Sequence, residues 1–398
     1  MKRKNMTSIY FAPLEGITGF AFRNTHYAAF ASVEKYYTPF TAPNYTHHWK
    51  TRDREDVDPA HNKDIPLIPQ ILTNRADDFL WAAGELVEMG YREINLNLGC
   101  PMPTVVKKHR GSGQLEDLDA LDLFLEQICT GMEKYGLSDE KGNSRKGNGE
   151  TEYVETGNDE IENDEIENDE TKNDETKNDE IKNDETGNDE IENEKTGNVE
   201  KTCSEGKLRF SIKTRIGLRT AENAAELLKI YNRYPLCELI VHPRTQTDLY
   251  KGTPDLETFE MILEDSAHPV VYNGDIFTIE DYTELITRFP ECPAVMIGRG
   301  LIANPALARE IRGGVPLEKE ELRRYHDSLY TALRQTLPGA APLIGKMKEL
   351  WFYMGRNFAD SDRFLKEIRK ARDLVRYEAA VRTLFAQGKF LPGKKITF

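Results

Sequence analysis

The stretch Glu93-Ile-Asn-Leu-Asn-Leu-Gly-Cys-Pro101 decides the fold of this 398-residue chain. Its apolar residues alternate with Asn95, Asn97 and Gly99, which is the two-residue period of a strand with one apolar and one polar face. In a parallel sheet both faces of a strand are normally buried, so the two amides need partners, and a bound polar ligand is a natural one. Cys100 follows in a turn. We therefore expect a thiol at the carboxyl end of a buried strand.

The rest of the chain alternates strand-like and helix-like segments. Eight β-like runs occupy residues 8–12, 33–38, 67–72, 93–98, 209–215, 238–242, 270–273 and 294–297. Segments with helical spacing lie between them, at 76–89, 119–134, 221–231, 256–264 and 279–288. This alternation is typical of an α/β fold of the (β/α)8 TIM barrel type, with a doubly wound open sheet as the competing arrangement. The barrel is favoured because polar and glycine-containing turns follow most strands and do not gather at one switch point.

An acidic segment interrupts this pattern. The formal net charge of the chain is −15, but residues 137–206 hold 25 Asp/Glu and 8 Lys/Arg, a net of −17, which leaves +2 on the remainder. From Asn158 to Asn193 an asparagine recurs every five residues, with almost no aromatic or branched apolar side chains. Such a segment buries too little apolar surface to offset its ordering entropy. We expect residues 137–206 to be a disordered insert, either a tolerated surface insertion or an electrostatic regulator.

The last part of the chain has a different character. The β-like runs stop near Val315, and residues 317–337, 343–354 and 362–385 have helical patterns. Residues 315–398 carry 17 Lys/Arg against 10 Asp/Glu, a net of +7. The apolar face of the last helix is expected to consist of Leu365, Ile368, Ala371, Val375 and Ala379. The pattern predicts a barrel domain over 1–314, interrupted by the insert, and a helical domain over 315–398 whose charge favours a polyanionic partner.

Cysteine usage and hydropathy indicate the compartment. Five widely spaced cysteines without a C-x-x-C pair argue against a disulfide framework and against a structural zinc site. No apolar run reaches the roughly 18–20 residues of a membrane span, and none follows the basic N-terminus as a signal peptide requires. We expect a soluble, cytoplasmic protein with no metal and no membrane partner. The sequence does not define the oligomeric state, and a monomer is the expectation.

Most predicted strands deliver a polar group near their carboxyl end, where barrel enzymes assemble their active sites. These groups are Pro13-Leu14-Glu15 after the first strand, then Gln70, Asn97 with Cys100, Lys213 with Arg215, His242, Asn273-Gly274-Asp275 and Gly298-Arg299-Gly300. Lys213 lies inside its strand. Burying an unpaired ammonium costs several kcal/mol, so we expect an anionic ligand beside it. The alternative is that Lys213 faces outward between helices.

The glycines after the last two predicted strands favour a phosphate group. Gly274 and Gly298-Arg299-Gly300 fall in the loops where barrels commonly bind phosphate, and Arg299 adds a bidentate cation. The expected ligand combines this phosphate with a carbonyl-rich ring for Gln70 and Asn97 and with a need for a lysine near developing negative charge. Flavin mononucleotide (FMN) fits that description.

These motifs together resemble the tRNA-dihydrouridine synthase family. The resemblance rests on the blocks 12–23 (APLEGITGFAFR), 97–101 (NLGCP) followed by 107–113 (KKHRGSG), 213–217 (KTRIG), 242–245 (HPRT), 273–276 (NGDI) and 298–300 (GRG), together with Gln70. It spans residues 8–312 apart from the insert, and the basic helical tail occupies the place of that family's tRNA-binding domain. Leu14 stands where methionine is common in the family, and the acidic insert is not part of its pattern.

The resemblance implies an FMN-dependent, NADPH-consuming enzyme that reduces the C5–C6 double bond of particular uridines in tRNA. Cys100 would be the proton donor, since a thiol with a pKa near 8.5 is mostly protonated at neutral pH. The residues expected to hold FMN are Pro13, Leu14, Glu15, Gln70, Lys213, His242, Asn273, Gly274, Asp275, Gly298 and Arg299, and, from its position on the strand, Asn97.

Two other functions stay open at this point. An FMN barrel reductase of a small molecule, such as a dihydroorotate-type enzyme or an ene-reductase, would keep the flavin residues but would not need a basic C-terminal domain. A non-catalytic RNA-binding protein on a decayed enzyme scaffold would have no reason to keep Cys100, Lys213 and the phosphate loops.

Overall fold

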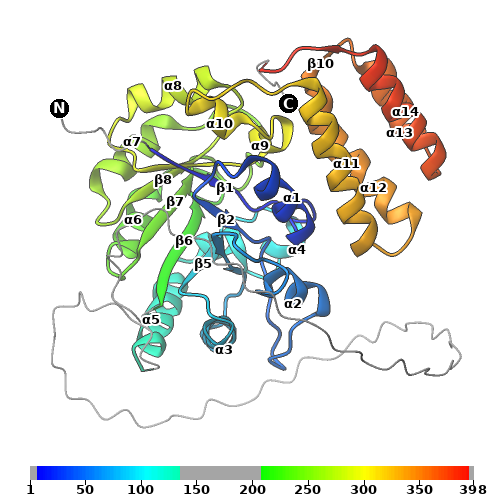
Figure 1. Cartoon of the computed structure of the whole chain (residues 1–398). Helices are drawn as coiled ribbons and strands as arrows, with labels where there is room; N and C mark the ends of the chain where they lie inside the picture. Colours follow the sequence, from blue (N-terminus) through cyan, green and yellow to red (C-terminus); the bar gives the residue numbers. More distant parts are fainter. Residues whose placement is uncertain (1–6, 135–207, 394–398) are drawn as a thin grey trace, which may run out of the picture. The chain divides into compact units, whose positions relative to one another are not determined.

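A computed structural model of the chain describes residues 7–134 and 208–393, which belong to one compact unit. The predicted insert at 137–206 therefore lies outside the described residues. At the centre is a parallel sheet (Figure 1). Its strands are β1 (Ser8–Phe11), β2 (Lys35–Tyr37), β3 (Leu67–Ile68), β4 (Gln70–Ile71), β5 (Glu93–Leu98), β6 (Arg209–Arg215), β7 (Glu238–His242), β8 (Val270–Asn273) and β9 (Ala294–Ile297). All eight predicted strands are confirmed.

The sheet closes on itself. Its order is β3-β2-β1-β9-β8-β7-β6-β5-β4, so β3 and β4 stand at its two ends. Only Pro69 separates these two segments, and proline has no N–H to give to a ladder. The Pro69 carbonyl still accepts a hydrogen bond from Asn95 N at 2.9 Å. β3 and β4 are therefore one interrupted strand that pairs with β2 on one side and β5 on the other. The fold is a (β/α)8 barrel, and the open-sheet alternative is wrong.

Helices follow the strands and surround the sheet (Figure 1). In chain order they are α1 (Phe20–Phe30), α2 (Thr51–Val57), α3 (Ala76–Glu88), α4 (Pro103–Val106), the 3₁₀ helix η1 (Gly111–Glu116), α5 (Leu118–Lys134), α6 (Ala224–Tyr231), α7 (Leu256–Asp265), α8 (Ile279–Arg288), α9 (Arg299–Ala303) and α10 (Leu307–Ile311). Side chains fix two of the starts: Asp255 accepts from Thr258 N, and Thr278 forms a reciprocal capping box with Asp281. All five predicted barrel helices are confirmed within three residues at either end.

Alternate residues along strands such as β1 belong to two different cores. Ile9 and Phe11 of β1 pack in the large cluster that includes the surrounding helices. Tyr10 and Ala12 pack in a small separate cluster with Ile240 and other strand residues, which is the barrel interior. At the amino end of the barrel, the Lys35 ammonium bridges Glu93 at 2.7 Å and Glu238 at 3.0 Å. Apolar side chains and ion pairs thus fill the amino end of the barrel interior. The polar side chains of the cavity lie at the carboxyl end.

The C-terminal region is helical, as predicted, and packs on the barrel. It contains α11 (Lys319–Thr336), α12 (Ala340–Met354), the 3₁₀ helix η2 (Gly355–Asn357), α13 (Asp362–Lys370) and α14 (Leu374–Gln387), with a short antiparallel pair of β10 (Phe358–Ala359) and β11 (Lys389–Phe390). Tyr325 of α11 makes edge-on ring contacts with Phe22 and Phe30 of α1. The proposed domain boundary at residue 315 stays a prediction.

The prediction of one helix over 362–385 is wrong. The backbone of Ala371 is extended, with ψ of 129°, and ends α13. Asp373 then caps a new helix, because its side chain accepts a hydrogen bond from Arg376 N. The predicted apolar face is confirmed for Leu365, Ile368 and Ala371, which are buried. It is wrong beyond the break, where Val375 is 74% exposed and Ala379 is exposed. The buried face of α14 is formed instead by Tyr377, Val381, Leu384 and Phe385.

Candidate active site

One cavity at the carboxyl end of the barrel collects the predicted site. Its volume is about 440 Å³, within the range of small-molecule and cofactor sites. All thirteen residues singled out in the sequence line it: Pro13, Leu14, Glu15, Gln70, Asn97, Cys100, Lys213, His242, Asn273, Gly274, Asp275, Gly298 and Arg299. These thirteen come from seven of the eight strands or from the loops that follow them, and Phe40 after β2 adds the eighth, so all strand ends meet at one place, as the barrel end requires.

The amides of β4 and β5 form a hydrogen-bonded row. Asn97 Nδ2 donates to Gln70 Oε1 at 2.7 Å, and Gln70 Nε2 donates to Asn95 Oδ1 at 2.7 Å. Asn95 Nδ2 then donates to Ser211 Oγ on β6 at 2.9 Å. The expectation that a ligand must satisfy the polar face of β5 is therefore wrong for Asn95, which has protein partners. The Gln70 amide keeps one further donor and one further acceptor position, so it can still meet a ring in the cavity.

The loop that carries Cys100 is held from three sides. Asn97 Oδ1 accepts from the backbone N–H groups of Gly99 at 3.0 Å and Cys100 at 2.8 Å. Ser112 Oγ of η1 donates to the Cys100 carbonyl at 2.8 Å, and Arg215 Nε donates to the Gly99 carbonyl at 2.9 Å. Burial raises the pKa of the Cys100 thiol. The side chain is therefore a protonated thiol at neutral pH.

Gly111 is required where η1 meets this loop. It has φ of +57°, and a Cβ there would lie 2.9 Å from the Cys100 carbonyl oxygen. The glycine of the 107–113 block thus allows the close approach of η1 to the thiol loop.

Lys213 faces the same cavity from β6. In the register of the sheet it stands opposite Asn97 of β5. Burial, with a contribution from the Arg215 charge, lowers the pKa of Lys213 to about 7. Among the described residues its ammonium has no ion-pair partner. The prediction that Lys213 points inward is confirmed, and the outward alternative is wrong.

His242 ends β7 as a neutral ring. Burial and the surrounding positive charges of Arg215, Lys213 and Arg244 hold the pKa of His242 well below its usual value. Its Nε2 atom lies 3.2 Å from Arg244 Nη1. Because a guanidinium can only donate, Nε2 must be the acceptor and the ring proton is on Nδ1. His242 therefore offers a neutral N–H donor.

The loops after β8 and β9 are joined by an ion-paired bridge. Asp275 receives Arg244 Nη2 at 2.5 Å and Arg299 Nη2 at 2.5 Å. The carboxylate fixes both guanidinium planes and offsets part of their charge. The glycines there are needed for packing: a Cβ on Gly300 would lie 2.0 Å from the Ile276 carbonyl oxygen, and one on Gly274 would lie 2.1 Å from the Tyr272 hydroxyl.

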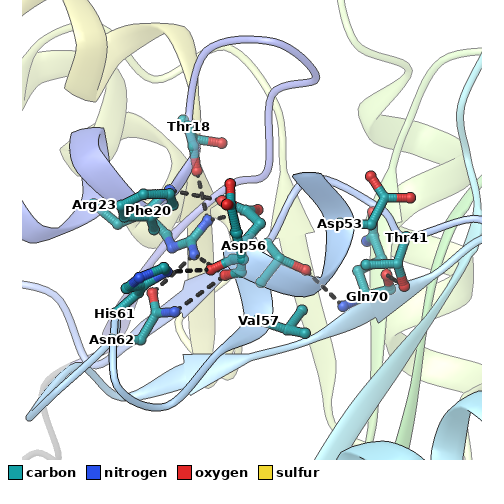
Figure 2. A network of polar contacts seen from close by, with 12 residues as sticks. Thr18, Phe20, Arg23, Thr41, Asp53, Asp56, Val57, His61, Asn62 and Gln70 are labelled. Carbon is teal, nitrogen blue, oxygen red and sulfur yellow. Dashed lines mark hydrogen bonds and ion pairs between the residues drawn. The ribbon is translucent and has the colours of Figure 1, made fainter. Parts of the chain in front are cut away.

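A buried arginine supports the loop between β1 and α1, which supplies Pro13, Leu14 and Glu15. Figure 2 shows the Arg23 guanidinium between Thr18, Asp56 and Asn62. It donates to the Thr18 carbonyl at 2.8 Å and to Asp56 Oδ2 at 3.1 Å, while Asp56 Oδ1 accepts from Phe20 N at 2.7 Å. Arg23 is 1% exposed. The network ties this cavity loop to the end of α2.

Sequence reasoning missed the part of the cavity wall that α12 provides. Glu349, Phe352 and Tyr353 of α12 line the cavity. Lys346, one turn earlier, donates to Glu349 Oε2 at 2.6 Å and also binds the Gly16 carbonyl of the β1–α1 loop. The sequence holds a usable signal, because 346, 349 and 353 share one helix face. The C-terminal helices thus complete the cavity as well as adding positive charge.

Tyr250 in the β7–α7 loop is the other missed lining residue of note. Its ring lies beneath two guanidinium groups, with centroid distances of 5.1 Å to Arg299 and 5.7 Å to Arg215. It therefore sits directly beside the predicted phosphate region.

Comparison with solved structures finds only weak similarity. A structure of morphinone reductase in complex with tetrahydroNAD aligns with 78% of this chain and 88% of its own chain, at 12% identity and a TM-score of 0.43. No helix in the two described ranges is both long and apolar enough to cross a membrane.

Sequence comparison is more informative. The tRNA-dihydrouridine(16) synthase of Neisseria meningitidis serogroup B is 22% identical over 390 residues, which covers 94% of this chain and 95% of that protein. The enzyme of the same name from Pseudomonas syringae pv. tomato is 30% identical over 175 residues, 41% of this chain and 53% of that protein. The family model described as "Dihydrouridine synthase (Dus)" matches residues 10–133 and 197–338, and the gap between them lies within or beside the acidic segment. Since the match covers more than half of the chain, this protein belongs to the dihydrouridine synthase family.

Proposed function

We propose that this protein is a tRNA-dihydrouridine synthase, which reduces the C5–C6 double bond of a uridine in tRNA. The observation that carries the proposal is that the Cys100 thiol and the Lys213 ammonium line the same cavity. Family membership and the names of the relatives support the substrate class. The basic C-terminal region, with a net of +7 over 315–398, supports a polyanionic substrate.

The cavity fits FMN as the cofactor. The half-buried Lys213 side chain faces the cavity without a counter-charge among the described residues, and an anionic ring would supply one. The Gln70 amide and the neutral His242 ring have hydrogen-bonding positions to spare for polar ring atoms. Arg299, held in place by Asp275, is a guanidinium suited to a phosphate. When bound, FMN supplies the hydride that is added to C6 of the uracil ring.

The remaining residues would hold and enclose the cofactor. Pro13, Leu14 and Glu15 form the loop that Arg23 and Lys346 fix in position. Asn273 donates to the Met296 carbonyl at 2.8 Å and so holds together the ends of β8 and β9. Gly300 lets these ends approach closely, while a Cβ on Gly274 would meet the Tyr272 ring and one on Gly298 would lie 3.3 Å from Ala12 and Leu14. Asn97 would act chiefly on the thiol loop, to which its side-chain oxygen is bonded.

The role proposed for Cys100 is that of general acid. Hydride addition at C6 must be completed by a proton at C5, and a positioned donor accelerates such a transfer. The raised pKa keeps the proton on sulfur at neutral pH. Lys213, which lines the same cavity, would place positive charge next to the negative charge that develops on the reacting rings. NADPH is the proposed source of electrons.

A spectrum and an assay together test the proposal. Purified full-length protein should show the visible absorption of a flavin that is bleached by NADPH. Added to tRNA transcript made without modified bases, it should convert one or more mapped uridines to dihydrouridine. A protein with a bleachable flavin that reduces free pyrimidines equally well would identify a small-molecule reductase instead. A colourless protein that cannot be loaded with FMN and still binds tRNA would identify an RNA-binding protein.

A further inference from the structure

The mouth of the cavity exposes large apolar side chains that the chemistry does not require. Met102, Tyr250 and Phe352 line the cavity and are 52%, 51% and 52% exposed. They come from three separate elements: the loop after β5, the loop after β7, and α12. Exposed single apolar residues are common, but several at one mouth mark a contact surface. An apolar or planar partner is therefore expected there.

Phe352 departs from the pattern of its own helix. The other large apolar residues of α12, Leu343, Ile344, Met347, Leu350, Trp351 and Met354, are 3% exposed or less. Phe352 instead projects at the cavity rim, with its ring edge-on to Tyr353 at 5.1 Å and 90°. Tyr353 itself lines the cavity. Helix packing thus buries the aliphatic side chains and Trp351, while the Phe352 ring stays exposed at the entrance beside the half-buried Tyr353.

Each exposed aromatic ring at the mouth is stacked with arginine. Arg356 lies 5.6 Å from the centroid of the Phe352 ring, and Arg299 lies 5.1 Å from that of Tyr250. Alternation of aromatic rings and guanidinium groups is what proteins use to hold unpaired nucleic acid: the rings stack on bases and the cations meet phosphates. The charge at the rim therefore suits an RNA strand better than an apolar small molecule.

We propose that Phe352, together with Arg356, is a stacking platform for the nucleotide that neighbours the target uridine. The inference rests on the proposed function. A uridine that enters the barrel must leave its stack, and the base beside it loses a stacking partner. Phe352 supplies a replacement surface at the rim, while the target base occupies the deeper part between Cys100 and Lys213. Because every base has a π face, the platform strengthens binding without selecting the identity of the neighbour.

Three substitutions separate stacking from simple apolar contact. Phe352→Ala removes the ring, Phe352→Leu keeps apolar bulk without a π face, and Phe352→Trp keeps a larger ring. Base stacking on an aromatic side chain changes affinity by about 5- to 150-fold per base. We expect a fall of that order in kcat/KM for tRNA, through KM, in the alanine and leucine variants, with the tryptophan variant close to wild type. The matched control is Val375→Ala on α14, which is 74% exposed and does not line the cavity.

The readouts distinguish this inference from the function on which it rests. Because Phe352 lines the cofactor cavity, flavin content and the rate of flavin reduction by NADPH are measured in every variant, and the tRNA kinetics are expressed per bound flavin. Bound flavin also shows that a variant folds. Affinity for a short single-stranded oligouridylate, measured separately, should fall in parallel with kcat/KM. If the wild type forms dihydrouridine and the alanine or leucine variant matches it in KM and in oligouridylate affinity, the platform is disproved and the function stands. If the wild type forms no dihydrouridine in any tRNA, the proposed function fails; the oligouridylate measurement still decides whether Phe352 stacks on a base.

Discussion

The side-chain oxygen of Asn97 accepts a hydrogen bond from the backbone N–H of Cys100 at 2.8 Å, and another from Gly99 at 3.0 Å. A residue of the strand thus fixes the turn that presents the thiol. The same amide donates to Gln70, so the thiol turn and the amide row of the barrel interior are one connected network. The two amides of β5 therefore have different structural roles. Asn95 joins the hydrogen-bonded row to Ser211, and Asn97 holds the turn that carries Cys100.

Replacement of Asn97 should destabilise the protein and misplace the thiol. Asn97→Ala leaves the buried Gln70 Oε1 without its partner, which costs about 1–3 kcal/mol. It also removes two hydrogen bonds to N–H groups of a half-buried loop, worth about 0.5 kcal/mol each because water reaches them. We expect a loss of about 2–4 kcal/mol in the free energy of unfolding, measured by urea denaturation, and a fall in kcat greater than the loss of flavin affinity. Asn97→Asp restores the acceptor for the loop and should recover part of the kcat. Equal kcat in the aspartate and alanine variants would contradict the role in the turn.

Cys100→Ala should leave binding intact and remove turnover. The thiol makes one hydrogen bond, with the backbone of Met102 in its own loop, and the loop is held by Asn97, Ser112 and Arg215 through backbone groups, so flavin content and tRNA affinity should match the wild type. Loss of a general acid lowers a rate by about 10²- to 10⁴-fold. Cys129→Ala is the matched control, because that thiol lies on α5 and does not line the cavity. A Cys100→Ala variant that forms dihydrouridine at the wild-type rate would exclude the thiol as the acid.

Lys213 should make the stability of the flavin-free protein depend on pH. Its pKa is lowered to about 7 in the folded state, against a normal value of 10.5 when unfolded. Between these values the unfolded state binds more protons, so stability rises with pH from about 7 to 10.5. Below pH 7 Lys213 is protonated in both states, so its charge destabilises the folded state by a constant amount. Urea denaturation should therefore show that the free energy of unfolding of the wild type increases from pH 6.5 to pH 9. The increase should be smaller in Lys213→Met.

Bound flavin provides the control for this pH effect. An anionic ring beside Lys213 raises its pKa towards the normal value, so the pH-dependent difference between wild type and Lys213→Met should shrink when FMN is bound. The variant should also bind FMN at least about tenfold more weakly, given the 1.4 kcal/mol that corresponds to each factor of ten. An identical pH profile for both proteins, with and without FMN, would mean that Lys213 does not face the cofactor.

Local patterns in the sequence were enough for the barrel and for the contents of its cavity. Period-two alternation identifies a strand, and polar residues at its carboxyl end must converge once the barrel closes, which is why Gln70, Cys100 and Lys213 line one cavity. For α12 the sequence shows that residues 346, 349 and 353 share one helix face, but not that this face meets the cavity, since that depends on how the C-terminal helices pack on α1. The break at Ala371 could not be seen in the sequence pattern, because helical spacing continues on both sides of it. The helix ends there because Asp373 caps a new helix, which buries a different face.

The strongest effect on stability is predicted for Arg23. Its guanidinium is 1% exposed and holds Thr18, Asp56 and Asn62 together, so removal leaves a buried carboxylate without its cation. Breaking such a pair costs about 3–5 kcal/mol, and Arg23→Met should lower the free energy of unfolding by that amount. The control is Arg288→Ala, whose ion pair with Glu260 at 2.7 Å is exposed on both sides and is worth about 0–1 kcal/mol. Because the β1–α1 loop carries Pro13 and Glu15, flavin should also be lost more readily from Arg23→Met than from a variant destabilised equally elsewhere, such as Leu384→Ala in α14. Equal flavin retention in these two variants would show that Arg23 supports the fold without supporting the cofactor loop.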